Sequence, residues 1–221
     1  MKRLVIAIDG PSGAGKGTVS RTLAASLGYR HIDTGAMYRA VGWKANVEGI
    51  SLEDERAVAD LAQRADIGVE GGIVSIDGRD VTRAIRTPEI DKAATAVARL
   101  PRVREIMVAR QRTLGDAGGV VMEGRDIGTV VFPAADVKIY LDASAEERAR
   151  RRVGDTAHTG GQAGQEAVAA SIAARDTSDT TRIVSPLTLA PDAAYIDTTG
   201  MPIEQVVDAV IELVRPRIRD S

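Results

Sequence analysis

The sequence predicts a three-layer α/β protein in which a mostly parallel sheet is flanked by helices. Three short apolar runs carry this prediction, at 4–8, 118–122 and 137–141, because such runs are typical of strands buried on both faces. Segments with the spacing of amphipathic helices separate the runs. Strands that alternate with helices are joined by crossovers, so we expect them to lie parallel to one another.

The first third of the chain predicts two strand–helix units. A glycine-rich turn follows the first apolar run, and a helix then extends to about Leu27, with Gly28 as its stop signal. His31 and Ile32 begin a second short extended segment. Thr34 opens another helix, and a further helix is expected over 53–65.

The pattern changes period between Asp66 and Val81. Apolar and polar residues alternate there on both sides of two adjacent glycines, which predicts a β-hairpin. Helices are expected over 88–100 and 101–114, each beginning with a proline, a residue that suits the first helical turn. The hairpin therefore lies between helices, and we interpret it as part of an inserted subdomain at about 34–100.

The last third predicts a capped helix, a loop, and a final strand and helix. Residues 144–147 read Ser-Ala-Glu-Glu, a capping box for a helix through Arg152. Residues 154–164 are small, polar and glycine-rich, so we expect a mobile loop. A helix over 165–175, an edge or final strand at 195–197 and a terminal helix over 202–217 complete the prediction of one 221-residue domain.

Composition excludes several classes of function. Lys plus Arg is 29 and Asp plus Glu is 31, a net charge of −2, which argues against a bulk basic surface for nucleic acid. The absence of cysteine excludes a Cys-based zinc site, a thiol nucleophile and a disulfide scaffold. The first apolar run is too short for a membrane span or a signal peptide, so we expect a cytoplasmic protein. With no obvious exposed apolar stripe, we also expect a monomer.

The most specific motif is a phosphate-binding loop that follows the first predicted strand. Its pattern, Gly-x-x-x-x-Gly-Lys, lets successive backbone N–H groups point inward and places a helix N-terminus against phosphate oxygens. The position after the lysine usually holds Ser or Thr, but here it is glycine, so no direct metal ligand is assigned. The predicted ATP-binding residues are Gly10, Pro11, Ser12, Gly13, Ala14, Gly15, Lys16, Gly17 and Thr18.

Four further motifs carry a resemblance to a known family. They are Asp-Thr-Gly-Ala-Met-Tyr-Arg at 33–39, Pro-Arg-Val-Arg at 101–104, Glu-Gly-Arg-Asp-Ile-Gly-Thr-Val-Val-Phe-Pro at 123–133 and Arg-Ile-Val-Ser-Pro-Leu at 182–187. With the phosphate loop, they make nearly the whole chain resemble the bacterial cytidylate kinases, which are P-loop nucleoside monophosphate kinases. The resemblance implies a P-loop kinase fold with a nucleoside-monophosphate-binding insertion, a lid at about 153–165, and ATP-dependent phosphorylation of CMP and dCMP.

The resemblance also implies roles for individual side chains. Cytosine would face Thr95, Arg104 and Asp126, because Asp126 accepts from the exocyclic amine, whereas uracil offers an acceptor there. The monophosphate would contact Arg39, Arg125 and Arg182. The ribose would contact Arg175 and Asp179. The full expected CMP-binding set is Asp33, Thr34, Arg39, Thr95, Arg104, Arg125, Asp126, Arg175, Asp179 and Arg182.

The expected chemistry is charge neutralisation at the transferring phosphoryl group. The residues assigned to it are Lys16, Arg125, Arg182, Arg148 and Arg152, although the sequence does not settle which arginine of 148–152 reaches the phosphoryl group. Mg²⁺ is expected to arrive with ATP, and Asp9, Glu123 or Asp126 would organise its waters.

Two classes of alternative stay open at this stage. The first is another small-molecule P-loop kinase that acts on UMP, AMP or shikimate. The second is a nucleotide-binding switch or binding module, which the absence of an Asn-Lys-x-Asp motif disfavours. A nucleic-acid-binding module is also disfavoured, because the chain has only six aromatic residues for base stacking.

Overall fold

The computed structural model describes residues 3–155 and 164–219. Its centre is a five-stranded sheet in the order β2-β6-β1-β7-β8, and every neighbouring pair in it is parallel. This confirms the predicted α/β class. The strands are β1 (Val5–Asp9), β2 (Arg30–Asp33), β6 (Val120–Gly124), β7 (Val137–Asp142) and β8 (Ala194–Asp197).

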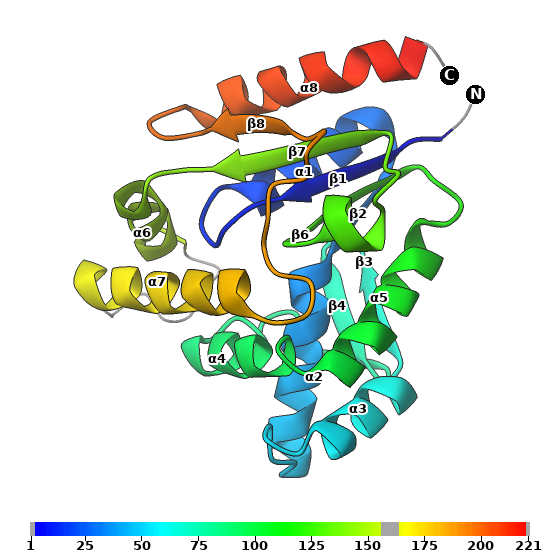
Figure 1. The fold of residues 1–221 in the computed structure, drawn as a ribbon, viewed down its shortest axis with the longest axis vertical. Helices are drawn as coiled ribbons and strands as arrows, with labels where there is room; N and C mark the ends of the chain where they lie inside the picture. Colours follow the sequence, from blue (N-terminus) through cyan, green and yellow to red (C-terminus); the bar gives the residue numbers. More distant parts are fainter. Residues whose placement is uncertain (1–2, 156–163, 220–221) are drawn as a thin grey trace.

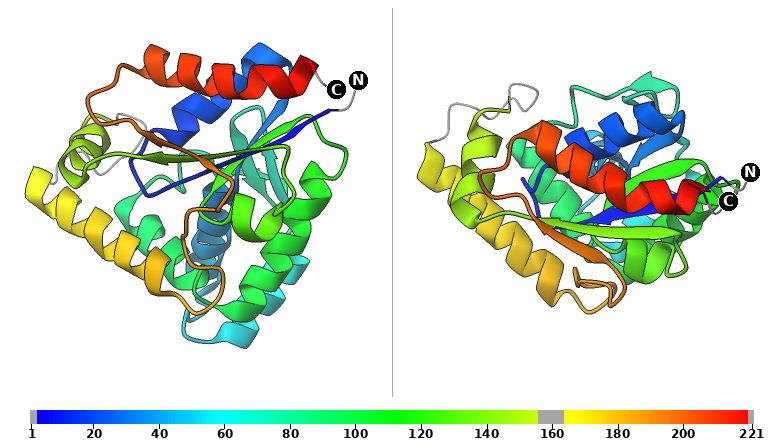
Figure 2. Two further views of the ribbon diagram at one scale, coloured as in Figure 1. Left: turned by 45° about the horizontal axis from the view of Figure 1, so that its top comes forward. Right: turned by 90° about the horizontal axis from the view of Figure 1, so that it is seen from above.

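Helices cover both faces of this sheet (Figures 1 and 2). On one face, α1 (Lys16–Leu27) and α8 (Ile203–Arg219) pack over apolar side chains of β1 and β7. On the other, α5 (Pro101–Gly115) and the short π-helical segment η1 (Ile127–Val131) share a second apolar core with β6. Because both faces are buried, the strands read as continuous apolar runs in the sequence.

The segment between β2 and α5 surrounds a separate apolar core, to which α5 also contributes Val103 and Met107. Helices α2 (Thr34–Glu48), α3 (Glu55–Arg64) and α4 (Pro88–Val97) enclose it together with a small antiparallel sheet. The predicted hairpin is present as two strands, β3 (Ile67–Glu70) and β4 (Ile73–Ile76), and a short third strand follows, β5 (Arg79–Asp80).

Helices α6 (Ala145–Val153) and α7 (Gln165–Thr181) pack against each other beside the sheet, and α7 also contacts α4. The glycine-rich stretch predicted at 154–164 lies, at 156–163, outside the described residues. Within the described ranges, no helix is long and apolar enough to cross a membrane.

Three boundary predictions are wrong. The helix expected over 88–100 ends at Val97, and the other two differences have identifiable reasons. The helix expected to end at Arg175 continues to Thr181, where the Thr180 and Thr181 hydroxyls donate to carbonyl groups of the preceding turn. The strand expected from Gly118 begins at Val120, because Gly118 adopts a positive φ of 63° and turns the chain instead.

Only half of the predicted capping box forms at α6. The Ser144 hydroxyl accepts from the backbone N–H of Glu147 at 3.2 Å, as expected of an N-cap. The Glu147 carboxylate does not return to the Ser144 N–H. Instead it accepts from Arg150 and Arg151, while the Ser144 N–H donates to the Thr199 hydroxyl at 2.8 Å.

Candidate functional site

A cavity of about 940 Å³ opens where the carboxyl ends of the parallel strands meet. Ligand sites in open α/β sheets are found at this edge. The cavity joins the phosphate loop and α1 with the ends of β2 and β6, the arginines of α6 and α7, and the chain after β8. Its lining includes Ser12 to Val19, Asp33, Arg39, Glu123, Arg125, Arg150 to Arg152, Arg175 and Thr198.

The phosphate loop is shaped by glycines that no other residue could replace without strain. Gly10 has a φ of 145°, and a Cβ added there would lie 1.9 Å from the carbonyl oxygen of Leu141. Gly13 has a φ of 83°, and its added Cβ would lie 2.9 Å from the Cβ of Arg148. The loop therefore packs directly on β7 and α6, while α1 begins at Lys16 with its N-terminus toward the cavity.

Lys16 is the buried cation of this loop. Its Nζ donates to the carbonyl oxygen of Pro11 at 2.7 Å, and the side chain is 7% exposed. Burial, together with the nearby positive charge of Arg125, holds the pKa of Lys16 well below its usual value. A phosphate group in the cavity would add negative charge beside this ammonium and favour its charged form.

Two carboxylates stand at the strand ends beside the loop. Glu123 lies at the cavity and pairs with His31, with 2.7 Å between Oε1 and Nε2. A Cβ added at Gly17 would lie 3.4 Å from Glu123 Oε1, so the glycine leaves this carboxylate room. Asp9 is buried and accepts from the N–H groups of Ile127 and Gly128, at 2.9 and 2.7 Å, which fixes the start of η1.

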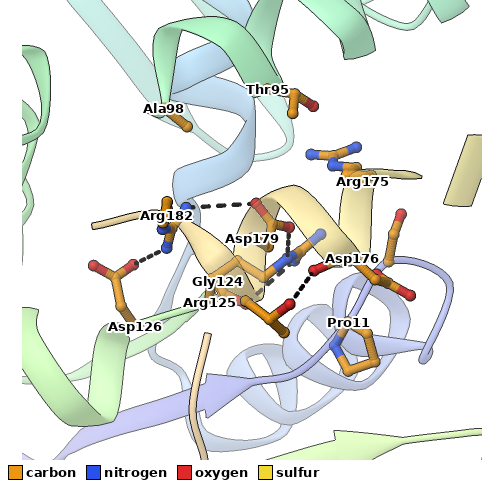
Figure 3. Close-up of polar contacts among 12 residues, drawn as sticks. Pro11, Thr95, Ala98, Gly124, Arg125, Asp126, Arg175, Asp176, Asp179 and Arg182 are labelled. Carbon is orange, nitrogen blue, oxygen red and sulfur yellow. Dashed lines mark hydrogen bonds and ion pairs between the residues drawn. The ribbon is translucent and has the colours of Figure 1, made fainter. Parts of the chain in front are cut away.

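Three arginines around the cavity each pair with an aspartate. Arg39 donates to Asp33 at 2.8 Å, Arg125 to Asp179 at 2.8 Å, and Arg175 to Asp91 at 3.3 Å. Burial would raise the pKa of Asp33, but Arg39 and the Ala36 N–H that it caps lower the pKa to about 2. Figure 3 shows Arg125 and Asp179 beside Arg182.

Two of the three residues expected to read the base, Arg104 and Asp126, form a second, buried cluster with Arg182, which is expected to hold the monophosphate. Arg104 donates to the carbonyl oxygen of Ala98 at 3.1 Å and to the Asp126 carboxylate, and its guanidinium lies 5.4 Å from the ring centre of Tyr38. Arg182 donates to the carbonyl oxygen of Ser185 at 2.6 Å, and its Nη2 lies 3.7 Å from Asp126 Oδ1.

The cluster differs from the cavity in its exposure. Arg104, Asp126 and Arg182 are at most 5% exposed, and none of these described residues is among those that line the cavity. Thr95 lies on α4 and donates to the carbonyl oxygen of Asp91 at 2.9 Å. Thr34, also predicted as a ligand, donates to the carbonyl oxygen of Glu123 at 2.7 Å and so joins the start of α2 to β6.

The arginines of α6 separate into different environments. Arg148 donates to the Ser12 carbonyl oxygen at 3.2 Å and pairs with Asp176 of α7. Arg152 donates to the Ser12 hydroxyl at 2.9 Å, so both predicted arginines attach α6 to the phosphate loop. Arg150, by contrast, has a side chain that is 67% exposed and pairs with Glu147.

One wall of the cavity was not predicted from the sequence. Thr198, Met201, Pro202, Ile203 and Val206 follow β8 and line the space beyond the phosphate loop. No local motif marks them. They reach the site because β8 is parallel to β7, which brings its carboxyl end to the same edge of the sheet.

Comparisons with known proteins show what the chain is similar to. The family model described as cytidylate kinase matches residues 6–216. A cytidylate kinase from Solibacter usitatus is 49% identical over 100% of this chain and 96% of its own length. One from Bacillus subtilis is 48% identical over 99% of both chains. An uncharacterized protein from Eubacterium ventriosum shares the fold, with a TM-score of 0.53 at 9% identity over 96% of this chain and 99% of its own.

Proposed function

The chain belongs to the cytidylate kinase family and is a phosphotransferase, and we propose that it transfers the γ-phosphoryl group of ATP to CMP and dCMP. One observation carries the proposal. A single cavity contains both a phosphate loop with Lys16 and the cations Arg39, Arg125 and Arg175. A donor triphosphate and an acceptor monophosphate both need such groups, and phosphoryl transfer needs them within one space.

The phosphate loop would bind the donor. The backbone N–H groups of residues 10–18 and the start of α1 favour the triphosphate, and Lys16 would contact its outer phosphates. The wall formed by Met201, Pro202 and Ile203 is apolar and would lie against the nucleoside.

The arginine–aspartate clusters would bind the acceptor. Arg39, Arg125 and Arg182 would hold the monophosphate, while Arg175 and Asp179 would meet the ribose. Among the described residues, Arg104 Nε and Arg182 Nη2 are buried without a hydrogen-bond partner.

Buried donors of this kind are costly unless a ligand or water accepts from them. Thr95, Arg104 and Asp126 would then read the cytosine edge, where the exocyclic amine donates to the carboxylate.

Mg²⁺ would enter with ATP. Within the described residues, no group of three or more His, Cys, Asp or Glu side chains is arranged to hold a metal ion. Mg²⁺ commonly keeps several waters and binds through substrate phosphates and one or two carboxylates, so the site fits this mode. Glu123, which lines the cavity beside Gly17, would hold those waters, and the ion would neutralise phosphate charge.

Catalysis by this chain would consist of positioning and charge neutralisation. Lys16 and Arg125 face the same cavity, and Arg148 and Arg152 bring α6 against the phosphate loop. The acceptor oxygen of a monophosphate is already anionic and needs no general base.

A coupled assay of ADP formation with a panel of acceptors tests the proposal. We expect turnover with CMP and dCMP to exceed turnover with UMP, AMP or shikimate at equal concentration. Lys16→Ala serves as the control for contaminating activity. Preference for any of the other three acceptors would contradict the assignment, and no acceptor-dependent turnover would favour a nucleotide-binding module.

A further inference from the structure

A polar seam joins α4 of the inserted segment to α7. Arg175 of α7 donates through Nη1 to Asp91 Oδ1 of α4 at 3.3 Å. About one helical turn further along α7, the Ser178 hydroxyl accepts from Arg99 Nη1 at 3.2 Å, just beyond the end of α4. In Figure 3, Thr95 of α4 lies across from Arg175. The seam therefore connects two elements that approach the cavity from different parts of the chain.

Arg175 lies close to other positively charged side chains. It lines the cavity together with Arg39 and Arg125. Burial, with the adjacent charge of Arg125, lowers the pKa of Arg175 to about 10. A flexible side chain repelled by its neighbours needs a partner to keep it at the cavity. Asp91 provides a hydrogen-bonding carboxylate for this purpose, in a pair whose side chains are 16% and 18% exposed.

We propose that Asp91 is a positioning residue for the acceptor nucleotide, which holds the Arg175 guanidinium where the ribose of a nucleoside monophosphate binds. The inference rests on the proposed function, because it takes Arg175 to contact that ribose. Asp91 acts through Arg175 and touches no substrate. Its effect therefore falls on the acceptor, since the donor is bound by the phosphate loop and Lys16, which are on other elements.

The experiment compares Asp91→Asn with a matched control on the same helix. Glu89→Gln makes the same carboxylate-to-amide change at an exposed position, where Glu89 accepts from Asn46 at 3.3 Å. We expect Asp91→Asn to raise KM for CMP about five- to tenfold, a scale between exposed and fully buried ion pairs, with KM for ATP unchanged. Glu89→Gln should leave both values at those of the wild type. Asp91→Glu, which keeps the charge, should recover part of the loss.

A double-mutant cycle separates positioning from a general structural effect. If Asp91 acts through Arg175, then Asp91→Asn adds nothing in an Arg175→Ala background. Full persistence of the effect in that background overturns the inference, as does an Asp91→Asn variant that matches Glu89→Gln, or an equal rise in KM for ATP. If the wild type does not phosphorylate CMP, both the proposed function and the inference are overturned. An active wild type with an unaffected Asp91→Asn variant overturns the inference alone.

Discussion

The pH dependence of folding stability should report directly on Asp9. This carboxylate ends β1, is 5% exposed, and accepts from the N–H groups of Ile127 and Gly128 at 2.9 and 2.7 Å. Burial raises its pKa from 3.8 to about 6, although these two hydrogen bonds and Lys16 oppose the rise. Asp9→Asn removes the titrating group and keeps nearly the same shape.

The sign of the effect follows from proton binding. Between about pH 4 and pH 6 the folded protein holds a proton on Asp9 that the unfolded chain has lost, so the free energy of unfolding falls as pH rises. A shift of about 2 pH units, at about 1.4 kcal/mol per unit, corresponds to about 3 kcal/mol. Asp33 has its pKa lowered to about 2, so its opposite contribution changes mainly below pH 4, and contributions common to wild type and Asp9→Asn cancel in their difference.

Urea unfolding of wild type and Asp9→Asn at pH 4, 5, 6 and 7 measures the effect. The difference in unfolding free energy, wild type minus variant, should fall by about 2.4 kcal/mol between pH 4 and pH 7, because Asp9 of the unfolded chain is still partly protonated at pH 4. The amide also places a donor against one of the two N–H groups, which adds an offset that does not change with pH. A difference that stays constant within about 0.5 kcal/mol, the usual error of additivity, would refute the reasoning.

Three further predictions concern the phosphate loop and the base. Lys16→Ala should lower kcat about a hundredfold or more in a folded variant, because the transferring phosphoryl group loses its cation. A kcat near that of the wild type would show that Lys16 takes no part in the phosphoryl transfer. Gly10→Ala should cost about 3 kcal/mol or more in urea unfolding, since its Cβ would lie 1.9 Å from a carbonyl oxygen. Gly49→Ala is the control, because Gly49 has a φ of 68° and an added Cβ there would meet no atom within 4 Å. It should lower the free energy of unfolding by only about 1 kcal/mol. Equal losses in the two variants would show that a Cβ at Gly10 does not clash. Asp126→Asn should reduce discrimination between CMP and UMP by about 1–3 kcal/mol in kcat/KM, and unchanged selectivity would contradict base reading by Asp126.

The features that the sequence predicted most reliably are those that depend on residues close together in the chain. The apolar runs gave β1, β6 and β7, because strands buried on both faces admit few polar residues. The glycine pattern of the phosphate loop was equally readable, since Gly10 and Gly13 are required by close packing within one short turn. The identity of the ligands is a different matter, and the assignments to CMP stay predictions.

What the sequence could not predict depends on partners far along the chain. The extension of α7 to Thr181 contradicts the low helix propensity of its last residues, and it places Asp179 against Arg125, 54 residues away. The failure of the Glu147 half of the capping box has a similar cause, because the Ser144 N–H donates to the Thr199 hydroxyl, 55 residues along the chain. Periodicity and motifs carry no information about either outcome.

The same long-range pairing explains how a chain with a net charge of −2 forms an anion site. Arg39, Arg125 and Arg175 each carry an aspartate partner, so the cavity does not depend on a surplus of positive charge over the whole surface. Bulk attraction would then contribute little to recognition, and the directed N–H groups of each guanidinium would contribute most. Replacing one of these arginines with lysine keeps the charge and loses the fork of donors, so the substitution should impair binding of CMP, measured as a rise in KM, although less than a neutral residue would.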